Sequence, residues 1–132
     1  MTLVWLVDDD AGNHGVAQAT VAEVAGVAFA GFLTAPEAVA EARRLARATP
    51  TALPSVVLMD YFLGEHRGDQ VTIDLLAACS PGPRPLVVGY SSMRSGSEAI
   101  LRAGGNVIVP KRSDRRGLNP WLWQFLSDHV RG

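Results

Sequence analysis

The chain has 132 residues, of which 48% are hydrophobic and 19% charged, a size that fits one compact domain over residues 1–132. With 12 basic against 13 acidic residues the formal net charge is −1, which excludes a global field toward nucleic acid or anionic membranes. Cys79 is the only cysteine, which excludes an internal disulfide and suits a cytoplasmic location. No segment predicts a signal peptide or a membrane span.

Five short apolar runs predict strands that are buried on both faces, because their apolar residues do not alternate with polar ones. The runs are Leu3–Val7, Val27–Leu33, Ser55–Met59, Leu86–Tyr90 and Asn106–Val109. A segment with apolar residues at helical spacing follows each run. This alternation predicts an α/β fold, a doubly wound parallel sheet of five strands with helices on both faces. We expect the strands in the common order 2-1-3-4-5.

Polar side chains collect where the predicted strands end. In an open parallel sheet, the loops at the carboxyl ends of the strands form the binding crevice. The polar residues at these ends are Asp8, Asp9 and Asp10 after the first strand, Asp60 after the third, Ser91 and Ser92 after the fourth, and Lys111 after the fifth. We therefore expect the functional site at this edge of the sheet.

The aspartates are concentrated at two strands that are expected to be neighbours. Two carboxylates 4 Å apart repel by about 1 to 4 kcal/mol, depending on the local dielectric. The cluster therefore needs a cation, a proton donor or raised pKa values, and Mg²⁺ suits a site of few carboxylates, several waters and a phosphate oxygen. The alternative is that Asp10 only caps the first helix and Asp8 is simply exposed.

Lys111 is the single lysine in a chain with eleven arginines. A compact ammonium on a flexible stem suits an anionic group at a strand end better than a planar guanidinium does. We expect Lys111 to face such a group. The alternative is an ordinary solvated surface lysine.

These motifs, in this order and at these strand ends, resemble the receiver domain of two-component response regulators. The segments that carry the resemblance are Val4–Asp10, Val56–Asp60, Val87–Ser92 and Lys111, supported by Gly68 and by Gly104–Gly105. The resemblance runs from the first strand to the last helix. It implies a flavodoxin-like (βα)5 fold and a signalling domain that is not an enzyme in the usual sense.

The resemblance also implies a role for each residue. Asp60 would accept a phosphoryl group from a histidine kinase or a phosphotransfer protein. Ser91 and Lys111 would bind the phosphoryl oxygens and couple them to a change on the face of the fourth helix, fifth strand and fifth helix, where an output partner or a second copy would bind. The Mg²⁺ ligands would be Asp8, Asp9, Asp60 and the backbone carbonyl of Phe62. Phosphoryl transfer itself needs an in-line nucleophile, a shared metal and positive charge.

Several features depart from the family's pattern. Pro110 precedes Lys111, whereas the family usually places proline after this lysine. Ile108 stands where most members carry a switch Tyr or Phe, and the loop after Asp60 lacks the common Pro-Gly turn. These departures leave open the aromatic half of the usual switch.

Two other functions fit parts of the pattern. A receiver-like interaction module without phosphorylation is favoured by Ile108 and the altered loop. The segment Asp8–Asp10 also fits the Asp-x-Asp motif of haloacid-dehalogenase-like phosphatases, although the chain lacks their cap and their acidic pair after the fourth strand. We expect no direct binding of the protein to nucleic acid or membrane.

The last predicted helix, Asn119 to Val130, carries one apolar stripe, which predicts contact with the sheet. The stripe consists of Leu122, Phe125, Leu126 and His129. Trp121 and Trp123 lie roughly 100° to either side of it, so we expect at least one of them to be exposed.

Overall fold

The computed structural model describes residues 1–132. One parallel sheet has the strand order β2-β1-β3-β6-β7. Its strands are β1 (Thr2–Val7), β2 (Val27–Phe32), β3 (Val56–Met59), β6 (Leu86–Gly89) and β7 (Val107–Ile108). The predicted α/β fold and strand order are confirmed. Each predicted strand end also lies within one residue of the observed one.

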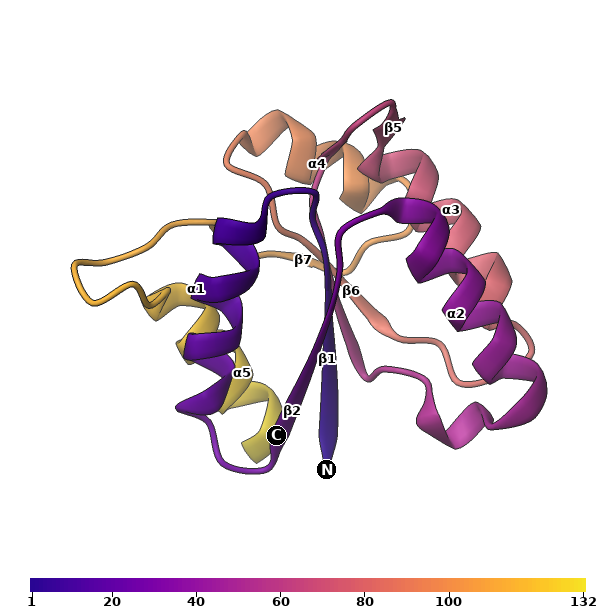
Figure 1. Ribbon diagram of the computed structural model, residues 1–132, viewed down its shortest axis with the longest axis horizontal. Helices are drawn as coiled ribbons and strands as arrows, with labels where there is room; N and C mark the ends of the chain where they lie inside the picture. The colour runs from indigo at the N-terminus through magenta and orange to yellow at the C-terminus, as the bar shows by residue number, and fades with distance from the viewer.

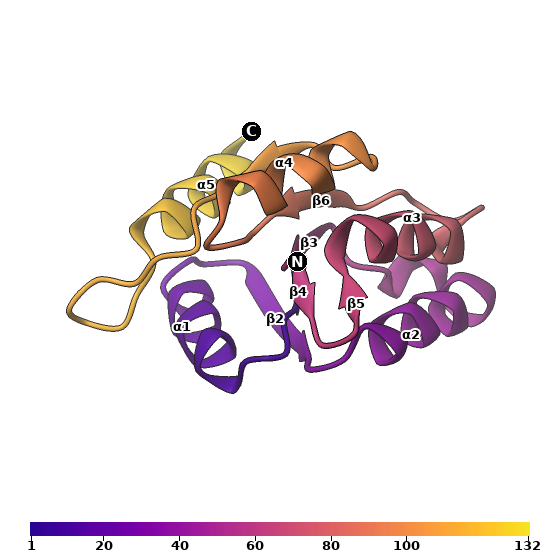
Figure 2. The same ribbon diagram turned by 90° about the horizontal axis from the view of Figure 1, so that it is seen from above.

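Five α-helices cover the two faces of this sheet (Figures 1 and 2). They are α1 (Ala11–Ala22), α2 (Ala35–Ala48), α3 (Gly68–Cys79), α4 (Arg94–Arg102) and α5 (Pro120–Arg131), with a short 3₁₀ helix, η1, at Pro50–Ala52. Helices α1 and α5 pack side by side on one face, and α2 and α3 lie together on the other. None of the helices has the length and hydrophobicity that crossing a bilayer requires.

The core has two parts, one on each face of the sheet. Alternate residues of β1 point to opposite faces, so Trp5 packs with α2 and α3 whereas Leu6 packs with α1 and α5. Because both faces are covered, the strands are apolar throughout. Cys79 is a free thiol buried in this core, where it packs as a small apolar side chain.

A small antiparallel hairpin follows β3 and was not apparent from the sequence. Its strands, β4 (Phe62–Leu63) and β5 (His66–Arg67), have two residues each, too few for an alternating pattern. The turn between them begins with Gly64 at a φ of 68°, a conformation that glycine adopts without steric cost. The hairpin fixes the path of the chain directly after Asp60.

The helix starts follow the sequence closely. The Asp10 side chain accepts a hydrogen bond from the Gly12 amide and Thr34 accepts one from the Glu37 amide, so both residues are N-caps. In α5, Leu122 and Leu126 are fully buried, while Trp121 is 47% and Trp123 40% exposed. The prediction that at least one indole is exposed is therefore confirmed for both.

Gly68 is required where α3 approaches the end of β3. A Cβ at this position would overlap the carbonyl oxygen of Asp60. We expect Gly68→Ala to lower the free energy of unfolding in urea by about 2 kcal/mol, since the backbone must shift to relieve the overlap. Gly15→Ala is the control: a Cβ there meets nothing within 4 Å, and alanine should stabilise α1 by about 0.5–1 kcal/mol. Equal effects of the two substitutions would contradict this role of Gly68.

Candidate functional site

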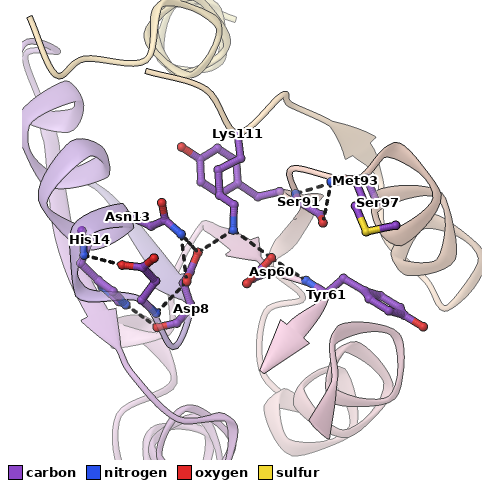
Figure 3. Close-up of polar contacts among 12 residues, drawn as sticks. Asp8, Asn13, His14, Asp60, Tyr61, Ser91, Met93, Ser97 and Lys111 are labelled. Atoms are coloured by element: carbon purple, nitrogen blue, oxygen red, sulfur yellow. Dashed lines mark hydrogen bonds and ion pairs between the residues drawn. The ribbon is translucent and has the colours of Figure 1, made fainter. Parts of the chain in front are cut away.

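The parallel register brings the strand ends to one edge of the sheet. Val7 of β1 pairs with Met59 of β3, and Met59 pairs with Gly89 of β6. The residues that follow these strands, Asp8 and Asp60 above all, therefore face a common space. Figure 3 shows Lys111 reaching into that space between the two aspartates.

Lys111 bridges the two buried carboxylates. Its Nζ lies 3.0 Å from Oδ2 of Asp8 and 3.0 Å from Oδ1 of Asp60. The Asp8 side chain is fully buried, and the lysine side chain is 11% exposed. The alternatives of a solvated surface lysine and of an exposed Asp8 are therefore wrong, and the repulsion between the carboxylates is balanced by one ammonium.

The pKa values of Asp60 and Lys111 are both raised by their surroundings. Burial raises the pKa of Asp60, and the charge of Asp8 raises it further, against hydrogen bonds from Lys111 and the Tyr61 amide. Burial alone would lower the pKa of Lys111, but its hydrogen bonds to Asp60 and Asp8 outweigh burial and raise it. The ammonium therefore stays charged at neutral pH, while Asp60 is a more basic carboxylate than an exposed aspartate.

Three carboxylates at this edge could hold a metal ion. One oxygen from each of Asp8, Asp9 and Asp60 lies within 4.8 Å of the others. They line a cavity of about 390 Å³, which Phe62 and Ser92 also line. A set of hard oxygen donors that opens to solvent on one side fits Mg²⁺, which keeps several of its waters when bound.

Asp10 lines the same cavity, but its carboxylate caps α1. Phe62 starts the β4–β5 hairpin two residues after Asp60, and its side chain is exposed. Its backbone carbonyl as a ligand of the metal stays a prediction.

Ser91 lies beside Lys111 but does not line the acidic cavity. It is nearly buried, and it shares an adjoining pocket with Lys111 and Ser97. Its amide donates to Oγ of Ser97 at 3.1 Å, and its own Oγ accepts from the Met93 amide at 3.2 Å (Figure 3). The hydroxyl proton of Ser91 is therefore left to donate elsewhere.

Two residues at the site were not singled out from the sequence. Nδ2 of Asn13 donates to both carboxylate oxygens of Asp8, at 3.3 and 3.1 Å, and Nε2 of His14 donates to the Asp8 carbonyl at 2.7 Å. The His14 ring lies where a Cβ on Gly31 of β2 would be. Asn13 lies one helical turn after the N-cap Asp10, a spacing that allows its contact with Asp8. The contact itself depends on how the chain bends from β1 into α1.

Tyr90 follows β6 and is buried, with its hydroxyl accepting a hydrogen bond from Asn119 at 2.9 Å. Burial, followed by the charge of Asp8, outweighs this hydrogen bond and raises the pKa of Tyr90 from 10.0 to about 12. The neutral phenol is therefore favoured in the folded state.

We expect a Tyr90-dependent loss of stability at alkaline pH. The contribution is complete below pH 10 and is lost as the pH rises through about 12, because the unfolded chain ionises first. Two pKa units correspond to about 2.7 kcal/mol. Urea unfolding of the wild type and Tyr90→Phe across this range should show the steeper decline in the wild type. Parallel pH profiles of the two proteins would contradict the prediction.

Among known proteins, only solved structures show a similarity to this chain, and that similarity is in the fold. Neither the scan of protein-family models nor the search of curated proteins finds a match for this sequence. The CheY-like response regulator receiver domain protein of Methanospirillum hungatei JF-1 is 16% identical with a TM-score of 0.73, and the match covers 99% of this chain and 94% of that one.

Two further structures agree with this match. For the signal receiver domain of the response regulator NarL from Mycobacterium tuberculosis, identity is 18%, the TM-score is 0.71, and coverage is 99% of this chain and 97% of that one. For the response regulator domain of Thermotoga maritima CheB, the values are 18%, 0.68, 99% and 92%. This chain has, over nearly its whole length, the fold of response regulator receiver domains.

Proposed function

We propose that the protein is a phospho-accepting receiver domain of a two-component system, in which Asp60 takes a phosphoryl group with Mg²⁺ held at the acidic edge. The observation that carries the proposal is that Lys111 bridges the carboxylates of Asp8 and Asp60, and that an oxygen of Asp9 lies within 4.8 Å of theirs. The structural neighbours include a phosphorylated cyanobacterial phytochrome response regulator, RcpA, and a BeF₃-activated receiver domain, DrrB.

The chain's own residues divide the work of phosphoryl transfer. Asp60 is the nucleophile, and its raised pKa makes its oxygen a better electron donor than that of an exposed aspartate. Asp8, Asp9 and Asp60, with the Phe62 carbonyl, would hold Mg²⁺. When bound, the ion would neutralise charge on the phosphoryl oxygens.

Lys111 and Ser91 would respond to the phosphoryl group. Lys111 gives up its contact with Asp60 and turns its charge to a phosphoryl oxygen, which suits a flexible ammonium that is already nearly buried. Ser91 donates its free hydroxyl proton to another oxygen. No separate substrate is turned over, so the protein is a signalling domain whose only chemistry is its own phosphorylation and dephosphorylation.

The proposed partners are a histidine kinase or a phosphotransfer protein as donor, and an output partner or a second copy on the face of α4, β7 and α5. The exposed Trp121 and Met93 lie on α5 and just before α4, where such a partner would contact them. A cytoplasmic setting agrees with a lone, buried thiol at Cys79.

Incubation with acetyl phosphate and Mg²⁺ tests the proposal. We expect the intact mass to rise by one phosphoryl group, with the modification mapped to Asp60 and lost when Mg²⁺ is chelated. Modification of Asp8 instead would favour the phosphatase-like alternative, although Asp8 is held by Asn13 and Lys111.

A receiver-like interaction module is the second candidate. The observation that favours it is the exposure of two large apolar side chains beside the site, Phe62 at 53% and Met93 at 49%. Unchanged mass under conditions where Mg²⁺ binds would support this function over the first.

A further inference from the structure

We propose that Asn119 is a positioning residue that holds both phosphoryl-facing residues, Ser91 and Lys111, and links them to the start of α5. The inference rests on the proposed function, because it assigns Ser91 and Lys111 to the phosphoryl group. It concerns how the signal leaves the site in a chain whose β7 carries Ile108 in place of an aromatic residue.

The side-chain amide nitrogen of Asn119, Nδ2, joins the two segments that carry Ser91 and Lys111. Its Nδ2 donates to the Tyr90 hydroxyl at 2.9 Å and to the Pro110 carbonyl at 2.9 Å. Tyr90 immediately precedes Ser91, and Pro110 immediately precedes Lys111. A displacement of Tyr90 or of Pro110 therefore acts on the same group, the side-chain amide of Asn119.

The rest of Asn119 is committed to the helices of the same face. Its Oδ1 accepts from the Trp121 and Leu122 amides, both at 3.1 Å, as the N-cap of α5. The backbone amide of Asn119 donates to Oγ1 of Thr20 in α1 at 3.0 Å. Asn119 and Thr20 are both fully buried, so breaking one of these bonds leaves a polar group without water.

The end of β6 is thereby held from both sides of the sheet. Ser91 is bonded through its amide to Ser97 of α4, and Tyr90 is bonded through its hydroxyl to Asn119. The Tyr90 ring packs in the core with Leu122 and Leu126 of α5. If Ser91 moves toward a phosphoryl oxygen, Tyr90 must move with it, and the cap of α5 must either follow or break.

This path leads to an exposed surface. The first turn of α5 carries Trp121 and Trp123, and the guanidinium of Arg112 lies 5.5 Å from the Trp121 ring centre. Arg112 directly follows Lys111. A shift of Asn119 therefore changes the position of two indoles that a partner can contact, without any aromatic residue in β7.

The test separates occupancy of the site from the response of α5. Wild type, Tyr90→Phe and Asn119→Ser are each treated with Mg²⁺ and beryllofluoride, a phosphoryl mimic. Occupancy is read from the ¹⁹F signal of the bound fluoroberyllate, and the response from amide hydrogen exchange at residues 121–124. Serine still caps α5, but it lacks the NH₂ group that donates to both Tyr90 and Pro110, and its single hydroxyl proton cannot replace both bonds. Tyr90→Phe removes only one of them. Tyr61→Phe is the control, because its hydroxyl forms no bond to Asn119.

We expect all four proteins to bind fluoroberyllate. Exchange at residues 121–124 should change on binding in the wild type and Tyr61→Phe, and this change should be lost in both Tyr90→Phe and Asn119→Ser. A full response in either variant, or a wild type that binds without any change in α5, overturns the role of Asn119. Absence of fluoroberyllate binding in the wild type overturns the proposed function, and the inference with it.

Discussion

Asp60→Asn is expected to abolish the gain of phosphoryl mass from acetyl phosphate and Mg²⁺. The amide lacks the anionic oxygen that attacks phosphorus, and it also removes one of the three carboxylates at the proposed metal site. The loss should be complete, because Asp8 is fully buried and occupied by hydrogen bonds, so it cannot replace Asp60 as acceptor. Intact-mass spectrometry over a time course measures the effect.

The matched control is Asp69→Asn in the first turn of α3, a carboxylate outside the cavity that pairs with Arg67. It should reach the same phosphorylated fraction as the wild type. A phosphorylated Asp60→Asn protein would show that another residue is the acceptor.

Asp9→Asn tests the metal site separately from the acceptor. Asp9 is the exposed member of the acidic group, and a metal bound by so few protein oxygens depends on each of them. We expect Mg²⁺ affinity, measured by calorimetry, to fall at least about tenfold, which corresponds to 1.4 kcal/mol. Equal affinity in Asp9→Asn and wild type would exclude Asp9 as a ligand.

The sequence predicts the fold and the strand-end residues well for a physical reason. Buried parallel strands must be apolar on both faces, so runs such as Val56–Met59 stand out, and the polar residue that follows each run must lie at the carboxyl edge. Once the order of the strands is fixed, Asp8 and Asp60 are neighbours. The position of Lys111 at that edge follows from the same argument, since β7 ends there as well. Its bridge between the two carboxylates is seen only in the structure.

The contacts that depend on loop paths could not be predicted in this way. The Asn119 side chain meets Tyr90 and Pro110 only because the long segment after Lys111 folds back to start α5 against α1. The motif of Asn119 followed by Pro120 predicts a helix start, and it says nothing about what the amide bonds. The β4–β5 hairpin and the contact of His14 with Asp8 are equally local results of how the chain turns.

The second large effect is expected from Lys111→Ala. Without the ammonium, the buried carboxylates of Asp8 and Asp60 face each other with no cation between them. Breaking a buried pair by removing one partner is strongly destabilising, and because the cavity opens to solvent we expect a loss of about 2–3 kcal/mol in the absence of Mg²⁺. Urea unfolding at neutral pH measures this loss.

Two conditions should restore part of the stability of Lys111→Ala. Mg²⁺ should stabilise the variant more than the wild type, because lysine no longer competes for the carboxylates. Low pH should help as well. The pKa of Asp60 is already raised by burial and by Asp8, and removing Lys111 takes away a group that lowers it. A carboxyl whose pKa is raised on folding destabilises increasingly as the pH climbs above its unfolded value, so the defect should grow from acid to neutral pH.

Arg112→Ala is the control for Lys111→Ala, since it removes a neighbouring positive charge that contacts neither carboxylate. It should leave both the unfolding free energy and its response to Mg²⁺ close to those of the wild type. If Lys111→Ala also matched the wild type, Lys111 would not balance the aspartates in solution. If instead it lost Mg²⁺ affinity but still responded to beryllofluoride as the wild type does, lysine would serve the metal site and not the phosphoryl group. Tighter Mg²⁺ binding with a lost α5 response is the result that the bridge between Asp8 and Asp60 predicts.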